Sequence, residues 1–227
     1  MLESWSWSTF DEVIEFVLKK IEPKAILDIG AGEGKYGRMT RAAGLDKAQV
    51  TAVEFNPGRR EELLALGYDS VRSIGALDLL EEPATTYELV VLGDVIEHFR
   101  WSDGMDLLQY LNYRSEYILV ITPESMAMNV PNFHDGHNSL WRPDAMRWHD
   151  MWAHCRCGVM HFYLLRGYLG NGRTPLREIV EAVNARQFIL KLSSSKLKDQ
   201  TCVLQLHDTT IADPYKEPGM VGVYRPK

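Results

Sequence analysis

A short apolar run that ends in a glycine-rich turn constrains the fold of this chain more than any other feature. The run is Ala25–Ile29, and the turn reads Asp28-Ile29-Gly30-Ala31-Gly32-Glu33-Gly34, with a helical pattern over residues 35–43 behind it. Short apolar runs bounded by glycine are typical of buried parallel strands. Glycines at alternate positions let the backbone turn sharply and let a ligand approach without meeting a Cβ. We therefore expect a ligand-binding loop at the carboxyl edge of an open sheet.

The alternation of strand and helix patterns continues up to Pro123. A helical pattern over 10–21 comes first, with Ser8 or Thr9 as its cap and Glu12 completing a capping box. Strands alternating with helices indicate a parallel sheet with helices on both faces. The predicted strands are 25–29, 49–54, 70–74, 88–92 and 117–122, and the predicted helices between them are 35–43, 59–66 and 104–111.

After Pro123 the pattern changes, because residues 126–140 form a loop rich in Asn, His, Pro and Gly. We expect the strands of this last part to extend the same sheet, since no linker separates it from the rest. The predicted elements are helices over 143–153 and 174–185, and strands over 158–165, 188–192, 202–207 and 221–224.

Composition narrows the class of protein. At 227 residues, 45% of them hydrophobic, the chain can bury a core without disulfides. A net charge of −6 disfavours nucleic acid as a partner, and the apolar runs are too short to span a membrane. Three cysteines are too few for a disulfide framework, and the N-terminus lacks the pattern of a secretory signal. We expect a cytoplasmic protein, and the sequence leaves oligomer formation open.

Three kinds of ligand compete for the glycine loop. Gly32-x-Gly34-x-x-Gly37 matches a dinucleotide fingerprint, but it begins late relative to the strand end. A phosphate-binding P-loop is ruled out, because Tyr36 follows Gly34-Lys35 where Ser or Thr is needed. The segment ILDIGAGEGKYG, residues 26–37, resembles the first motif of class I methyltransferases that use S-adenosylmethionine (SAM). A carboxylate such as Asp28 repels a pyrophosphate but favours the sulfonium and ammonium groups of SAM.

The resemblance extends over further strand ends. Glu54 stands where the family binds the ribose hydroxyls, although its spacing also suits NAD. Gly75 stands where an adenine-binding acid is expected, so Asp78 or the backbone of Ala76 and Leu77 takes that role. The string Gly93-Asp94-Val95-Ile96-Glu97-His98 resembles the Asp-x-x-Glu-His signature of the small-molecule or sugar-type branch. The cofactor residues implied are Asp28, Gly30, Ala31, Gly32, Gly34, Tyr36, Glu54, Phe55, Asn56, Ala76, Leu77, Asp78, Gly93, Asp94 and Val95.

Histidines supply the candidate catalytic groups. His98 follows the fourth predicted strand, and His137 begins a His-x-Ser-x-Trp segment that related methyltransferases carry. A histidine near the acceptor could take its proton. His134 and Asp135 with Trp141 are candidate substrate contacts.

The resemblance implies an α/β fold with a doubly wound, mostly parallel seven-stranded sheet and an antiparallel C-terminal portion. We expect one domain over 1–227, with an N-terminal helical arm (1–22), a SAM-binding core (23–125) and an acceptor-side part (126–227). The implied function is methylation of a hydroxyl or amine on a small-molecule or saccharide acceptor. Two alternatives stay open: an NAD-linked oxidoreductase and a non-catalytic SAM-binding partner subunit.

A zinc site is the alternative use of a cysteine and histidine cluster. The cluster reads His154-Cys155-x-Cys157-x-x-x-His161. Its Cys-x-Cys spacing is shorter than the usual one, and neighbouring residues of a strand point to opposite faces. We therefore expect no metal site.

Overall fold

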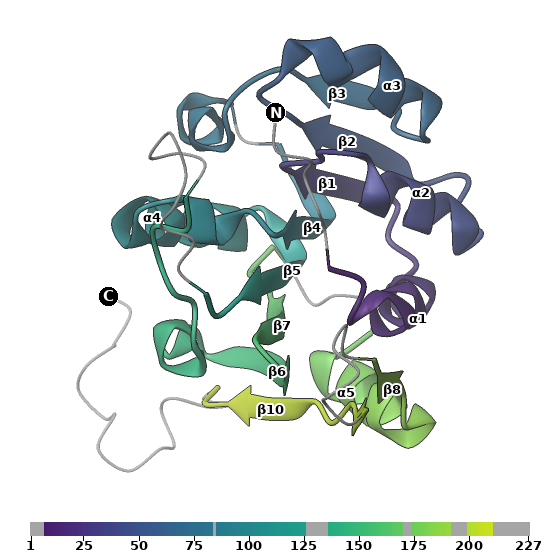
Figure 1. The fold of residues 1–227 in the computed structure, drawn as a ribbon, viewed down its shortest axis with the longest axis vertical. Helices are drawn as coiled ribbons and strands as arrows, with labels where there is room; N and C mark the ends of the chain where they lie inside the picture. Colours follow the sequence, from purple (N-terminus) through teal and green to yellow (C-terminus); the bar gives the residue numbers. More distant parts are fainter. Residues whose placement is uncertain (1–6, 84, 126–135, 170–173, 192–198, 211–227) are drawn as a thin grey trace, which may run out of the picture.

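The computed structural model describes residues 7–83, 85–125, 136–169, 174–191 and 199–210, and within them one large sheet forms the centre of the molecule (Figure 1). Its strand order is β10-β6-β7-β5-β4-β1-β2-β3. Five strands are parallel: β1 (Ala25–Ile29), β2 (Gln49–Val53), β3 (Ser70–Arg72), β4 (Tyr87–Gly93) and β5 (Ser115–Pro123). Each of the other three is antiparallel to its inner neighbour: β7 (Met160–Arg166), β6 (Met151–Cys157) and β10 (Gln205–Asp208). A separate short pair joins β8 (Ile189–Leu190) to β9 (Gln200–Thr201).

Helices cover both faces of the sheet, because its central strands are apolar on both sides. One hydrophobic cluster joins the sheet to α1 (Asp11–Ile21), α2 (Lys35–Ala42), α3 (Arg60–Ala65) and α5 (Leu176–Arg186). The other cluster joins the opposite face to α4 (Trp101–Asn112) and to the short 3-10 helices η2 (Ala76–Glu81), η3 (Ile96–His98) and η5 (Pro143–Met146). A further 3-10 turn, η1 (Pro57–Arg59), precedes α3.

The predicted α/β fold, mostly parallel with an antiparallel C-terminal portion, is confirmed. Eight strands stand in the described part of the sheet where seven were expected, because β10 adds to the edge beyond β6. The predicted strand over 221–224 lies outside the described residues.

Two local predictions were wrong. The helix expected over 143–153 is only the turn η5, since the chain enters β6 at Met151 and pairs there with both β7 and β10. Pairing and burial on both faces override the helical spacing of that segment. The predicted capping box is absent as well, because the helix begins after Phe10 without a side-chain cap. Phe10 is buried and packs against Phe162 instead.

Strand register aligns the loops that matter for function. Ile29 pairs with Val53 on one side and with Leu92 on the other, and Gly93 pairs with Ile121. The carboxyl ends of β1, β2, β4 and β5 therefore meet at one edge. The sheet continues from β1 to β2 on one side and to β4 on the other (Figure 1). Such a reversal of strand order opens the crevice where α/β proteins bind ligands.

Candidate cofactor and acceptor site

The glycine loop after β1 needs its glycines for backbone conformation. Gly30, Gly32 and Gly34 have φ values of 70°, 49° and 74°, in the left-handed region that favours glycine. The N–H of Gly30 donates to the carbonyl of Val53 at 2.8 Å, which ties the loop to β2. A Cβ at Gly30 would lie 2.3 Å from Val95 Cγ2, so the loop also packs closely on the segment after β4.

Glu54 links this loop to the end of β2. Its Oε2 accepts a hydrogen bond from Gly32 N at 3.0 Å, and its Oε1 accepts one from Asn56 N at 2.9 Å. The carboxylate is nearly buried, whereas the next side chain, Phe55, is 78% exposed. Asn56 uses its side-chain oxygen to cap η1. The structure thus brings the predicted residues of β2 beside the glycine loop.

Asp28 lies beneath the loop rather than on its surface. It is wholly buried, and its Oδ2 accepts a hydrogen bond from the Tyr68 hydroxyl. Its Oδ1 is buried without a hydrogen-bond partner among the described residues. Burial raises the pKa of Asp28 to about 7; the Tyr68 hydrogen bond opposes that shift and the charge of Glu54 adds to it. Asp28 is buried because β1 is covered on both faces, and its predicted contact with the cofactor stays a prediction.

The predicted adenine contacts follow β3. Asp78 Oδ2 accepts a hydrogen bond from Gly75 N at 2.8 Å, so this exposed carboxylate caps η2. Ala76 and Leu77 form the first turn of η2 and are partly exposed. Asp78 therefore stabilises the start of η2. The predicted adenine contacts of Ala76, Leu77 and Asp78 stay a prediction.

The end of β4 and the segment after it pack on Tyr36 and on the glycine loop. A Cβ at Gly93 would lie 2.2 Å from the hydroxyl oxygen of Tyr36, which is itself buried. Tyr36 thus packs under the crevice. Asp94 has φ 55°, a strained conformation for a residue with a Cβ, and such strain is concentrated at functional sites. Its Oδ2 accepts a hydrogen bond from Trp7 N at 3.3 Å, and Lys35 Nζ donates to Trp7 O at 2.6 Å.

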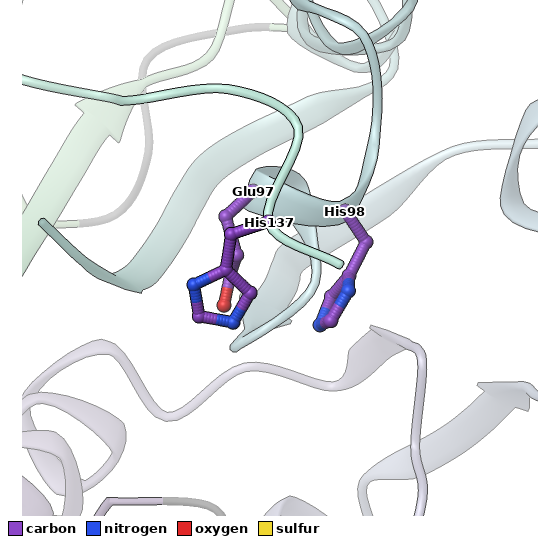
Figure 2. Close-up of side chains that lie close together, drawn as sticks. All are labelled: Glu97, His98 and His137. Carbon is purple, nitrogen blue, oxygen red and sulfur yellow. The ribbon is translucent and has the colours of Figure 1, made fainter. Parts of the chain in front are cut away.

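Two histidines meet beyond Asp94. Figure 2 shows Glu97 and His98 projecting from η3, with His137 entering the same space from the loop after β5. The rings of His98 and His137 are perpendicular, with centroids 5.1 Å apart. His98 Nδ1 lies 3.1 Å from Gly136 O, and His137 Nδ1 lies 2.8 Å from Ser125 O. Because a carbonyl only accepts, Nδ1 carries the proton in each neutral ring and Nε2 carries the lone pair.

The loop that carries His137 is fastened to η3. Asn138 N and Ser139 N both donate to Glu97 O, at 2.6 and 3.1 Å. The indole N–H of Trp141 donates to Ile96 O at 3.2 Å and to Ser139 Oγ at 2.8 Å.

The predicted substrate contact of Trp141 is corrected by its position. Trp141 is 1% exposed and stacks on Trp101, because the hydrophobic cluster around α4 surrounds its ring. It holds the loop from within the core. His134 and Asp135, the other predicted substrate contacts, lie outside the described residues.

Glu97 is a candidate site residue that the sequence analysis did not single out. It is fully buried; its Oε2 accepts a hydrogen bond from Thr122 Oγ1 at 3.0 Å, and its Oε1 has no such partner among the described residues. Burial raises the pKa of Glu97 to about 8, and the charge of Asp94 adds to that shift. One ligand atom from each of Glu97, His98 and His137 lies within 4.8 Å of the others. The sequence signal that could have pointed to Glu97 is its place in the Asp-x-x-Glu-His string.

The structure separates the cysteines and histidines of the candidate zinc cluster. His154 Nε2 lies 2.9 Å from His161 Nδ1, and His154 stacks on Tyr163 at one face of the sheet. Cys155 and Cys157 belong to the hydrophobic cluster of the other face. In the part of the chain that the structure describes, the group of Glu97, His98 and His137 alone has a spacing that could hold a metal ion.

No helix of the described residues is long and apolar enough to cross a membrane.

Comparison with known proteins gives similarity of structure but not of sequence. No family model and no curated protein matches this chain. An O-methyltransferase family protein from Burkholderia thailandensis superposes with a TM-score of 0.54 at 10% identity, over 70% of this chain and 56% of that protein. The chain therefore spans about half the length of that protein.

Two further structures contain S-adenosylhomocysteine (SAH), the product of SAM. A SAM-dependent methyltransferase from Bacteroides fragilis has a TM-score of 0.50 at 16% identity, over 68% of this chain and 76% of that one. The plantazolicin methyltransferase BamL has a TM-score of 0.51 at 9% identity, over 70% and 85%. The fold of this chain is thus the class I methyltransferase fold, and two of the proteins that share it were crystallised with SAH.

Proposed function

We propose that this chain transfers a methyl group from SAM to a hydroxyl, or an amine, of a small-molecule or saccharide acceptor. One observation carries the proposal: at the edge where the strand order reverses, the loop containing Gly30 to Gly34 follows β1, and the pair of His98 and His137 meets just after the neighbouring strand β4. The first feature suits a nucleoside cofactor, and the second suits an acceptor that must lose a proton.

The charges around the crevice fit SAM better than a dinucleotide. Asp28, Glu54 and Asp94 are three carboxyl groups close to the loop. A pyrophosphate would meet repulsion there, whereas a sulfonium or an ammonium group is attracted. Glu54 keeps further lone pairs beyond its two backbone hydrogen bonds, which ribose hydroxyls can use. The buried Oδ1 of Asp28 is an acceptor that a cationic ligand above the loop would help to satisfy.

The chemistry requires positioning and proton removal. The acceptor oxygen forms a bond to the methyl carbon of SAM as the sulfur–methyl bond breaks and SAH leaves, and the acceptor proton passes to a base. The Nε2 atoms of His98 and His137 carry lone pairs at the acceptor end of the crevice. A group held at that end would gain rate from orientation and from proton acceptance. A hydroxyl benefits most, because a neutral amine is already a nucleophile.

Binding calorimetry with SAH and NAD is the first test. Wild type should bind SAH and not NAD, and Glu54→Ala should weaken SAH about tenfold or more, because it removes two loop anchors. Glu61→Ala is the matched control, since Glu61 is exposed on α3. Binding of NAD alone would establish the oxidoreductase alternative instead.

Turnover separates an enzyme from a SAM-binding subunit. Radiolabel from SAM should pass to one of a panel of hydroxyl, amine and saccharide acceptors. His98→Ala should keep SAH affinity and lose turnover. SAH binding without transfer to any acceptor would support the non-catalytic alternative.

A further inference from the structure

We propose that Glu97, His98 and His137 bind one divalent transition-metal ion at the acceptor end of the crevice. The ligands would be a carboxylate oxygen and two imidazole nitrogens, all within 4.8 Å of one another. Bonds of about 2.1 Å put neighbouring ligand atoms about 3–4 Å apart, so small side-chain rotations close the site. Figure 2 shows the three side chains pointing into the same space.

The hydrogen bonds behind the histidines are those of metal ligands. His98 Nδ1 faces Gly136 O, and His137 Nδ1 faces Ser125 O. Histidines that bind metals usually donate their other ring N–H to a carbonyl or carboxylate, which fixes the tautomer and the direction of the lone pair. Both rings here have this arrangement, so the lone pair of each neutral ring is on Nε2.

Glu97 gives an independent reason to expect a cation. It is fully buried, its Oε1 has no hydrogen-bond partner among the described residues, and a second carboxyl group, that of Asp94, lies near it. Buried carboxylates are normally paired or bind metals. Thr122 Oγ1 holds Oε2 at 3.0 Å and so fixes the orientation of the group.

The site is built before any ion arrives. The backbone of the His137 loop is bonded to Glu97 O, and Asn138 Nδ2 donates to His98 O at 2.8 Å. The two ligand-bearing segments therefore move as one unit, which reduces the cost of assembling the site.

The ligand types select the class of ion. Two imidazoles and one carboxylate suit Mn²⁺, Fe²⁺, Co²⁺ or Zn²⁺, whereas Mg²⁺ and Ca²⁺ prefer oxygen ligands. Three protein ligands leave coordination positions open. This part of the inference rests on the proposed function: an acceptor hydroxyl in an open position would lose its proton more easily, so the ion would serve the activation assigned above to the histidines.

Cobalt titration of chelator-treated protein tests the site directly, with visible absorption and calorimetry as readouts. Wild type should bind one Co²⁺ per chain and should not bind Ca²⁺. His137→Ala and Glu97→Gln should each weaken Co²⁺ about tenfold or more. The glutamine variant keeps the size of the side chain, and circular dichroism checks that both variants fold. His207→Ala is the matched control, because His207 lies on β10 near a separate group of histidines on β6 and β7.

The outcomes separate this inference from the proposed function. Equal Co²⁺ affinity in wild type and both site variants, or loss only in His207→Ala, overturns the metal site. Co²⁺ binding without SAH binding keeps the metal site and removes the methyltransferase proposal. If the protein binds SAH, binds no Co²⁺, and keeps its turnover after chelation, the methyltransferase proposal stands and the metal site is removed.

Discussion

Tyr68 donates its hydroxyl hydrogen to Asp28 and accepts a hydrogen bond from Gly37 N at 3.0 Å. One phenol thereby links β1 to the first turns of α2, directly below the glycine loop. A Cβ at residue 37 would lie 2.3 Å from the Tyr68 ring. Close packing of α2 on the Tyr68 ring therefore explains Gly37, the third glycine of the dinucleotide pattern, without a pyrophosphate.

Removing that hydroxyl should destabilise the fold. Tyr68→Phe removes the hydrogen bond that Asp28 Oδ2 accepts and leaves a buried carboxyl group unsatisfied, so we expect the free energy of unfolding to fall by about 1–3 kcal/mol. Urea denaturation measures the change. Tyr113→Phe is the control, because Tyr113 is 66% exposed and should change stability by less than about 0.5 kcal/mol. Equal effects of the two substitutions would contradict the structural role of the bond.

Asp28 should make stability fall as pH rises. Its folded pKa of about 7 lies above the ordinary value of 3.8, so the folded state holds the proton more tightly. That contribution is fully present below about pH 4 and is lost as pH rises to about 7. Asp28→Asn cannot titrate, so its stability relative to wild type should rise between pH 5 and pH 8. Urea unfolding of both proteins at these pH values measures the difference; a constant difference would mean that Asp28 titrates normally.

Local sequence patterns were enough to predict the parallel sheet and its ligand-binding edge. The alternation of apolar runs with helical spacing marks the strands and helices, and glycines mark where strands end. The order of Asp28, Glu54 and Gly93 on successive strand ends was enough to place them at one crevice. The strand predicted over 202–207 begins only at Gln205, as β10. Cys202 and Leu204, which made the earlier residues look like a strand, are buried before β10 begins. Its pairing with β6 depends on contacts distant in sequence.

The sequence could not predict which side chains are exposed. Asp28 and Trp141 both resemble ligand contacts by position, yet each is buried by partners far along the chain, Tyr68 for the first and Ile96 for the second. The same limit hid Glu97. Its importance arises from burial and from the approach of His137, which the loop after β5 brings from a distant part of the chain.

Gly30 should tolerate alanine less well than Gly44. Both have positive φ, but a Cβ at Gly44 meets nothing within 4 Å, whereas one at Gly30 would meet the stiff Val95 side chain. Gly44→Ala should cost about 1–2 kcal/mol for conformation alone, and Gly30→Ala about 1–3 kcal/mol more for overpacking. Thermal and urea unfolding give the comparison. Gly30→Ala should also weaken SAH, measured by calorimetry, and equal stability of the two variants would show that the loop does not pack on Val95.

Trp141 should act on turnover through the position of His137 rather than through acceptor affinity. Trp141→Phe removes the indole N–H that bonds Ile96 O and Ser139 Oγ, so stability should fall by about 1–3 kcal/mol. The loop that carries His137 would then be held less firmly, and small misplacement of a reacting group costs about tenfold or more in kcat. SAH affinity should change less than kcat, because the hydrogen bonds of the indole go to Ile96 and Ser139 and not to the glycine loop. Tyr113→Phe, at the exposed C-terminal end of α4, is the control and should leave kcat close to wild type. A rise in KM with unchanged stability in Trp141→Phe would instead restore a direct contact with the acceptor.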